Sequence, residues 1–470
     1  MENKQPQTAP ADVRENIMGT MDINPLLIKL SVPMMISMLV QALYNVVDSI
    51  FVSHVSENAL TAVSLAFSLQ NVMIAVGVGT GVGVNALLSK SLGEKDQARA
   101  NKTAENGIFL SLCSYAVFLL IGLTCMKPYF YAQTSDMDIA RQGILYLSIC
   151  CVLSLGLFTQ TTGEKLLAAT GRTHLSMISQ LVGAVVNIVL DPIFIFWLDL
   201  GVQGAAWATV IAQGCSAVWV LVFLTGRKAA LRLRPRYMVL KPARVRKIVS
   251  LGLSGFFMNL TNSLVQVVCN ATLQVYGGDL YVGVMTIINS LREVFMMPIH
   301  GLSNGAQPVT GYNYGAGLYS RVRQSIRFSV AGTVGCAALF WAAAMVFPGA
   351  LIRIFNGDAE MLAAGVPAMR IYFCLFIPMS LQMAGQGVFV SLGRSRQAIF
   401  FSLLRKAVIN APLTVLLPVW MGTDGVFVAE AVSQLVGGLA CIITMYWTVY
   451  RPFGRLPDRA GGCKEDREDS

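Results

Sequence analysis

The sequence predicts an all-α polytopic membrane protein with twelve transmembrane helices, arranged in two six-helix lobes that are related by a parallel internal repeat. Three observations predict this fold class. The chain is 55% hydrophobic and only 13% charged, whereas a soluble domain has about 25% charged residues. Its apolar residues gather in long runs, and residue patterns of the first half return in the second half. So much apolar surface is stable only where lipid replaces water as the solvent.

The apolar runs have the length of membrane-spanning helices, which need about 20 predominantly apolar residues. Twelve stretches qualify: 27–53, 60–88, 106–126, 140–163, 175–198, 204–225, 248–275, 281–309, 328–347, 365–391, 399–419 and 425–449. We therefore expect a cytoplasmic N-terminal tail (1–26), an N-lobe (27–225), a basic cytoplasmic linker (226–247), a C-lobe (248–450) and a cytoplasmic C-terminal tail (451–470).

Basic residues predict the orientation of these helices. The linker contains Arg227, Lys228, Arg232, Arg234, Arg236, Lys241, Arg244, Arg246 and Lys247. Loops rich in Lys and Arg stay in the cytoplasm. We therefore expect a multi-pass protein of the inner or plasma membrane with both termini in the cytoplasm. The formal charge of +10 then belongs to membrane loops, and no nucleic-acid partner is expected.

The two halves repeat at an offset of 222 residues. The matching positions include glycines and a turn: Gly79, Gly83 and Gly93 return as Gly301, Gly305 and Gly315, and Gly171-Arg172 returns as Gly393-Arg394. Small residues at four-residue spacing let helices approach closely. Because each half has an even number of spans, the halves have the same orientation and enclose a central cavity between them.

Ionisable residues deep in a span are costly and indicate function. The first half has three carboxylates of this kind, Asp48, Asp191 and Glu164, and Asn187 lies on the same helix face as Asp191. At the 222-residue offset the second half has only Asn270 for Asp48 and Gln386 for Glu164. This asymmetry predicts a dedicated ion site in the N-lobe.

Each carboxylate also has a simpler interpretation. Asp48 would be solvated if it lay at the outer mouth, and Asp191 would cap a helix broken at Pro192. Glu164 would form a solvated pair with Lys165. No zinc spacing, hydrolase motif or ATP-binding motif occurs in the sequence, so no cofactor is expected, and the energy must come from an ion gradient or from the substrate's own gradient.

The sequence resembles the multidrug and toxic compound extrusion (MATE) family, in particular its DinF-like prokaryotic type. The segments that carry the resemblance are VVDSIFV at 46–52, SLGEKD at 91–96, NIVLDP at 187–192 and LGVQGAAWAT at 200–209. The resemblance implies an antiporter that exports amphiphilic, mostly cationic drugs in exchange for protons or sodium, by alternating access of the two lobes.

The resemblance also implies a polar coupling cluster in the N-lobe. Its members would be Asp48, Tyr146, Asn187, Asp191 and Thr209, of which all but Tyr146 are possible sodium ligands. We add Glu164 to the ion-coupling candidates. The chain departs from the sodium-coupled NorM-like branch, because helix 7 has Asn262 and Asn270 where that branch has an acidic residue.

We expect the substrate cavity near the bilayer midplane. The residues expected to line it are Tyr44, Phe67, Gln70, Met73, Asn270, Met285, Asn289, Met296, Gln382 and Gln386. A lipid-linked saccharide flippase of the same fold is the nearest alternative. It would need several cations in the cavity, where we find mainly Arg292 beside Glu293. A membrane receptor or enzyme is a remote alternative, since neither a large soluble domain nor a catalytic constellation is evident.

The predicted topology can be tested with fused reporters. A reporter placed in the segment 226–247 should read as cytoplasmic, and reporters near Ser56 and Gly277 should read as external, because the basic loops stay inside. Paired phosphatase and fluorescence reporters give opposite signals on the two sides and control for expression. The reverse readout at these sites would invert the orientation.

Overall fold

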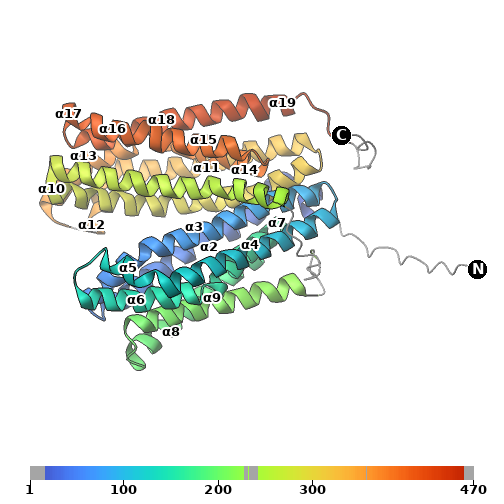
Figure 1. Cartoon of the computed structure of the whole chain (residues 1–470). Helices are drawn as coiled ribbons and strands as arrows, with labels where there is room; N and C mark the ends of the chain where they lie inside the picture. Colours follow the sequence, from blue (N-terminus) through green and yellow to red (C-terminus); the bar gives the residue numbers. More distant parts are fainter. Residues whose placement is uncertain (1–15, 227–230, 232–241, 356, 460–470) are drawn as a thin grey trace, which may run out of the picture.

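The computed structural model describes residues 16–226, 231, 242–355 and 357–459, and the described chain is built from helices without strands. The two lobes lie side by side, one blue to green and the other yellow to red (Figure 1). The first and last described segments lie at the same end of the helices, where Asn313 donates a hydrogen bond to the carbonyl of Met18 and the N–H of Arg459 donates one to the carbonyl of Gly317. The predicted linker at 226–247 and the two terminal tails fall largely outside the described residues.

The N-lobe contains the first half of the helices. They are α1 (Ile17–Thr20), α2 (Ile23–Ser53), α3 (Glu57–Gly93), α4 (Gln97–Thr124), α5 (Met126–Tyr131), α6 (Met137–Val152), α7 (Leu155–Ala169), α8 (Thr173–Pro192), η1 (Ile193–Trp197) and α9 (Val202–Thr225). The helices α6 and α7 form one bent span with an angle of 49° between them.

The C-lobe repeats this arrangement. Its helices are α10 (Pro242–Gly315), α11 (Tyr319–Val346), α12 (Pro348–Arg353), α13 (Ala359–Phe373), α14 (Phe376–Ser391), α15 (Ser395–Leu403), η3 (Leu404–Asn410), α16 (Ala411–Leu416), α17 (Pro418–Met421), α18 (Asp424–Met445), η4 (Tyr446–Tyr450) and α19 (Arg451–Phe453). The pair α13 and α14 is bent by 44°, at the place equivalent to the bend between α6 and α7.

The number of membrane spans agrees with the sequence prediction. Within the described residues, nine helices are long and apolar enough to cross a membrane, or eleven if each bent pair is one span. The helix α10 is 74 residues long and reverses at Gly278, whose φ of 63° combined with a ψ of −163° is favourable only for glycine. It therefore supplies two spans, which brings the total to twelve.

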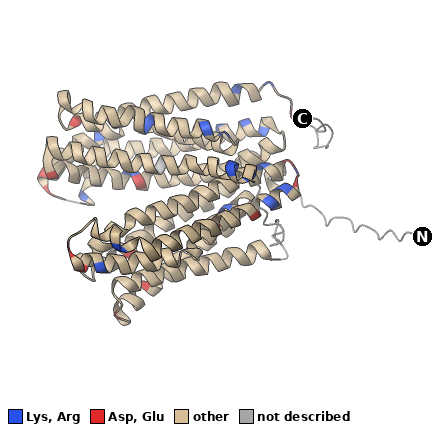
Figure 2. Cartoon of the chain, viewed as in Figure 1, with Lys and Arg blue, Asp and Glu red and all other residues tan. Residues whose placement is uncertain are grey.

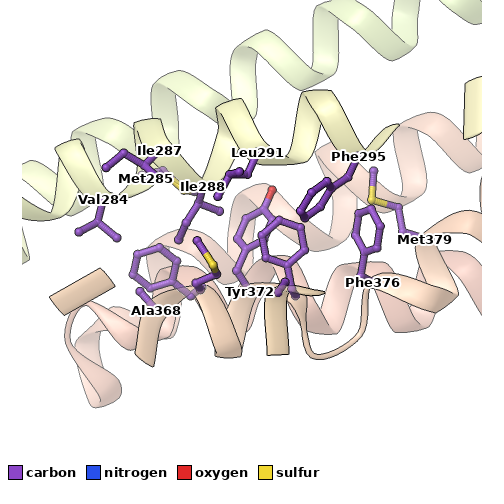
Figure 3. Close-up of a cluster of buried hydrophobic side chains, with 14 of the residues drawn as sticks. Val284, Met285, Ile287, Ile288, Leu291, Phe295, Ala368, Tyr372, Phe376 and Met379 are labelled. Atoms are coloured by element: carbon purple, nitrogen blue, oxygen red, sulfur yellow. The ribbon is translucent and has the colours of Figure 1, made fainter. Parts of the chain in front are cut away.

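Charged side chains are sparse in the middle of the helices and collect at their ends (Figure 2). Lys and Arg are most frequent at the end of the molecule where the first and last described segments lie. Each lobe has its own hydrophobic core, and the larger C-lobe core packs α10 against α13 and α14 through residues such as Ile288, Phe295 and Tyr372 (Figure 3).

The lobes meet in a symmetric contact that follows the 222-residue repeat. The Nδ2 atom of Asn85 donates a hydrogen bond to Oε1 of Gln307 at 3.2 Å, and these residues are equivalent in the two halves. Gly93 of α3 lies against the carbonyl oxygen of Tyr312, and its equivalent Gly315 lies against that of Lys90. The glycines were predicted to allow close helix approach, and the structure confirms it.

Substitution of an interface glycine should disfavour this arrangement of the lobes. The Cβ atom of Gly93→Ala would overlap the backbone of Tyr312, which has no room to move. In a cysteine-free background, cross-linking of Asn85→Cys to Gln307→Cys by a short bis-methanethiosulfonate reagent should fall several-fold. Gly335→Ala is the matched control, because nothing lies within 4 Å of the added Cβ. Equal cross-linking in both variants would show that the contact is dispensable.

Candidate ion and substrate site

Two carboxylates of the N-lobe face each other from neighbouring helices. Asp48 lies near the end of α2, Asp191 lies near the end of α8, and the two helices pack along each other. Asp191 is fully buried and Asp48 is half-buried. Pro192, which has no N–H to donate, follows Asp191, and the chain continues in the π-helical turn η1. Such turns are frequent at functional sites.

The geometry differs from the simpler interpretation of Asp191 as a helix cap. The helix α8 continues through this residue, and Nδ2 of Asn187 donates a hydrogen bond to Oδ1 of Asp191 at 3.3 Å. The Nδ2 atom of Asn187 also lies 3.5 Å from Oγ1 of Thr209 on α9. The spacing of four residues therefore brings Asn187 and Asp191 onto one face, as the sequence predicted.

The carboxyl groups of Asp48 and Asp191 lie within hydrogen-bonding reach of each other. Ionised carboxylates only accept hydrogen bonds, so this contact requires a proton or another cation at the pair. Three oxygen atoms of the cluster are buried without a hydrogen-bond partner in the described structure: Asp48 Oδ1, Asn187 Oδ1 and Asp191 Oδ2. Buried polar atoms without a partner are costly, and these are hard oxygen ligands suited to a small cation.

Tyrosines complete the cluster. Tyr44, one helical turn before Asp48, interacts electrostatically with both carboxylates. Tyr146 lies near Asp48 and Tyr44, and its hydroxyl accepts a hydrogen bond from Nε2 of Gln70 at 3.3 Å. The structure thus brings together every residue of the polar cluster that the family resemblance implied, while its part in ion coupling stays a prediction.

Glu164 is a separate buried carboxylate on α7, only 6% exposed. Its Oε1 accepts hydrogen bonds from Gln160 and Ser179, and its Oε2 accepts one from Gln180, each at 3.0 Å. The solvated pair with Lys165 is not formed; Nζ of Lys165 instead lies 3.4 Å from Oδ1 of Asn304 in the other lobe. These hydrogen bonds to the Glu164 carboxylate therefore come from neutral side chains, while Lys165 acts on it only electrostatically.

A cavity of ≈ 350 Å³ lies between the lobes. Most of its wall is apolar, with polar groups from both lobes: Tyr44, Gln160, Glu164, Lys165, Gln180, Asn187, Thr209, His300, Asn304, Gln307 and Gln386. Tyr44, Asn187 and Thr209 belong both to this wall and to the carboxylate cluster. The cluster therefore borders the cavity directly.

Of the residues predicted to line the cavity, Tyr44 and Gln386 do so. Met73 lies in the N-lobe core, and Met285 and Met296 lie in the C-lobe core (Figure 3). They face the interior of their own lobe, where flexible thioether side chains fill gaps between helices.

The remaining predicted cavity residues also lie outside this wall. Gln382 is buried and donates to the carbonyl of Phe401 at 3.1 Å. Phe67 is half exposed on α3, and Gln70 contacts Tyr146. Asn270 and Asn289 are partly buried in α10.

The C-lobe contains a charged cluster that the sequence interpretation missed. Glu430 of α18 and Lys406 of η3 are each 3% exposed and form an ion pair, with Nζ at 2.9 Å from Oε1. Arg405 is equally buried, and Asn410 also donates a hydrogen bond to Glu430. The expectations that only the first half retains buried carboxylates, and that Arg292 is the main internal cation, were wrong.

The signal for this cluster was present in the sequence. Arg405 and Lys406 interrupt the apolar span 399–419, and Glu430 interrupts the span 425–449. Charged residues inside a span indicate function by default. Glu430 has no carboxylate as its N-lobe equivalent, because Ala208 stands at that position at the 222-residue offset.

Comparison with known proteins gives one family. The MatE family model matches residues 33–193 and 255–416, which is more than half of the chain and covers both lobes. The multidrug export protein MepA of Staphylococcus haemolyticus (strain JCSC1435) is 23% identical over 431 residues, which are 91% of this chain and 93% of that protein.

Two further proteins are similar over nearly their whole length. An FAD transporter of Shewanella oneidensis is 23% identical, and the match covers 89% of this chain and 93% of that protein. Among solved structures, the outward-facing conformation of a multidrug resistance MATE family transporter of the MOP superfamily has a TM-score of 0.88 and 22% identity. The match covers 93% of this chain and 98% of the chain in that structure. This similarity shows a shared fold.

The buried ion pair of the C-lobe should be sensitive to removal of one partner. Lys406→Met leaves the Glu430 carboxylate without its cation, which should lower the free energy of unfolding by about 3–5 kcal/mol. Thermal melting of the purified protein measures the effect. The double variant Lys406→Met/Glu430→Gln removes both charges and should lose less. A double variant that is as unstable as the sum of its parts would show that the two residues do not act as a pair.

Proposed function

The chain belongs to the MatE family, and we propose that it is a secondary active multidrug exporter driven by an inward flow of protons or sodium ions. The proposal rests on the family match over both lobes and on the similarity to a multidrug export protein along 91% of the chain. A cavity between two lobes, bordered by a cation-binding cluster, has the arrangement that such an exporter needs.

The observation that carries the ion coupling is the set of unpartnered oxygens around Asp48 and Asp191. A proton held between the two carboxyl groups removes their repulsion, and a sodium ion bound by the same oxygens has the same effect. Loss of the cation leaves two negative charges in a low-dielectric site, which is costly. The packing of α2 against α8 therefore depends on whether the site holds a cation.

Ion and substrate then influence each other through shared side chains. Tyr44, Asn187 and Thr209 belong to the wall of the cavity and to the cluster. A ligand shifts an equilibrium between two conformations only if it binds one of them more tightly. Occupation of the cluster by a cation and of the cavity by a drug satisfies this requirement, because each changes the position of the shared side chains.

The chemistry of the cavity suits amphiphilic cations. Its wall is mainly apolar, and Glu164 supplies the carboxylate within it. Methionines at the wall, such as Met34, Met38 and Met383, adapt to ligands of different shape. Lys165 is the only Lys or Arg among the described residues of the wall, so the cavity lacks the group of cations that a pyrophosphate-carrying lipid would need.

The orientation completes the proposal. Both termini and the basic loops would lie in the cytoplasm, and the protein would reside in the inner or plasma membrane. The basic residues at the end that carries the first and last described segments support this orientation (Figure 2).

Transport by inverted membrane vesicles tests the function directly. Vesicles that contain the protein should accumulate a fluorescent amphiphilic cation when a proton gradient or a sodium gradient is imposed, and should not do so when the gradient is collapsed. Comparison of the two gradients identifies the coupling ion. Absence of accumulation with either gradient, for a panel of unrelated cations, would contradict the proposal.

Substitution of the cluster tests the coupling site. Asp48→Asn and Asp191→Asn remove the charge that holds the cation, so active accumulation should fall to the background. Asp199→Asn is the control: Asp199 is exposed in the same lobe, and asparagine accepts its positive φ of 50°. Accumulation at the wild-type rate in either cluster variant, with equal amounts of protein, would refute the assignment.

A further inference from the structure

The charged cluster of the C-lobe has more positive than negative groups. Lys406 and Arg405 lie next to each other on η3, Arg292 lies on α10, and each interacts electrostatically with Glu430. Arg292 also pairs with Glu293 at 2.7 Å, but the Glu293 side chain is 63% exposed. Glu430 is therefore the one fully buried carboxylate near three cations in the described part of the lobe.

Glu430 has no capacity left for Arg405. Its Oε1 accepts hydrogen bonds from Lys406 at 2.9 Å and from Gln434 at 3.4 Å. Its Oε2 accepts from Lys406 at 3.1 Å and from Asn410. A carboxylate oxygen offers about two lone pairs, so both oxygens are saturated.

Three donor atoms of the two arginines are left without partners in the described structure, although Arg292 also interacts with Glu293 and Tyr372. The Nε and Nη1 atoms of Arg405 and the Nε atom of Arg292 are buried and have no hydrogen-bond acceptor in the described structure. Arg405 is 4% exposed, and its aliphatic stem packs against Gly437 of α18, where a Cβ atom would lie 2.8 Å from Cγ of the arginine. A guanidinium group that is always charged cannot remain in such a place without an acceptor, because it cannot lose its proton.

The cluster begins, along the chain, just after the C-lobe wall of the cavity. Ala398 and Ser402 line the cavity on α15, and Arg405 follows three residues after Ser402. The π-helical segment η3 begins between them, at Leu404, and contains both Arg405 and Lys406. Departures from regular helix geometry of this kind often occur at binding sites.

We propose that the C-lobe binds a small anionic group, a carboxylate or a free inorganic anion, between Arg405 and Arg292. The anion accepts the unpartnered guanidinium hydrogen bonds and neutralises the excess positive charge, while the Lys406–Glu430 pair forms the rest of the site. The site is distinct from the Asp48–Asp191 pair and prefers ligands of the opposite charge. It extends the range of substrates to zwitterions, whose amine and carboxylate can be held by different lobes.

Anion-dependent stability tests the site without transport. The purified full-length protein should melt at a higher temperature in chloride or acetate than in a bulky organic sulfonate at equal ionic strength, with a saturable dependence on concentration, because a ligand stabilises the state that binds it. Arg405→Met should weaken the apparent affinity for chloride at least about tenfold. Arg353→Met, which removes an exposed arginine of the same lobe, should leave it unchanged.

Arg405→Lys is a conservative variant that tests the site even if Arg405→Met does not fold. It keeps the charge but loses the fork of donors, so it should retain part of the anion effect. Equal melting in all three anions, or an anion effect of the same size in Arg405→Met, would overturn the proposal and assign Arg405 a packing role.

Transport separates the two sources of the anionic group. A drug that carries both an amine and a carboxylate is compared with its methyl ester in the same vesicles. If the substrate supplies the anion, Arg405→Met raises the KM for the acid about tenfold and leaves that for the ester unchanged. If a free anion occupies the site, chloride stimulates the transport of both compounds by the wild type and of neither compound by Arg405→Met. Equal transport of the acid and ester in both proteins, without chloride stimulation, argues against either form of the proposal.

Discussion

The lobes of this protein touch backbone to backbone, and such a contact needs positions without a Cβ atom. Gly93 meets the carbonyl of Tyr312, and the equivalent Gly315 meets that of Lys90, so one contact is made twice about a pseudo-twofold axis. The hydrogen bond between Asn85 and Gln307 lies among these contacts on the same two helices. Because α3 and α10 are held here, the cavity has one wall from each lobe, and any bound molecule contacts both halves of the repeat.

A shared scaffold does not impose shared chemistry on the lobes. In the N-lobe, Asn187 donates to Asp191 four residues later; in the C-lobe, Thr414 donates to Oδ1 of Asn410 over the same spacing. The C-lobe bond is made without a carboxylate, and it lies one residue away from the positions equivalent to Asn187 and Asp191 at the 222-residue offset. The C-lobe carries its buried carboxylate on α18 instead, where Lys406 neutralises it. The Asp48–Asp191 cluster thus retains unpartnered acceptors, whereas Arg405 and Arg292 retain unpartnered donors.

The fold and the N-lobe cluster followed from the sequence because both depend on local patterns. Span length, the repeat offset and the spacing of Asn187 and Asp191 are visible along one dimension. The family resemblance added Tyr146 and Thr209, which come from other helices. The cavity lining was harder, because a methionine such as Met285 faces either the cavity or the core according to helix rotation, which packing decides. The π-helical segment η3, which contains Arg405 and Lys406, has no signature in composition.

The opposite polarity of the lobes gives antiport an electrostatic basis in the proposed mechanism. A cation in the cavity is attracted toward the acceptor oxygens of the N-lobe and repelled by the excess positive charge of the C-lobe. A proton or sodium ion at Asp48 and Asp191 cancels the attraction, and so weakens drug binding without occupying the same atoms. Tyr44, Asn187 and Thr209 transmit the change, because they line the cavity and contact the pair or each other. By linkage, a bound drug must weaken the binding of the ion by the same factor. Exchange of one for the other then requires only that the two lobe arrangements expose the cavity to opposite sides of the membrane.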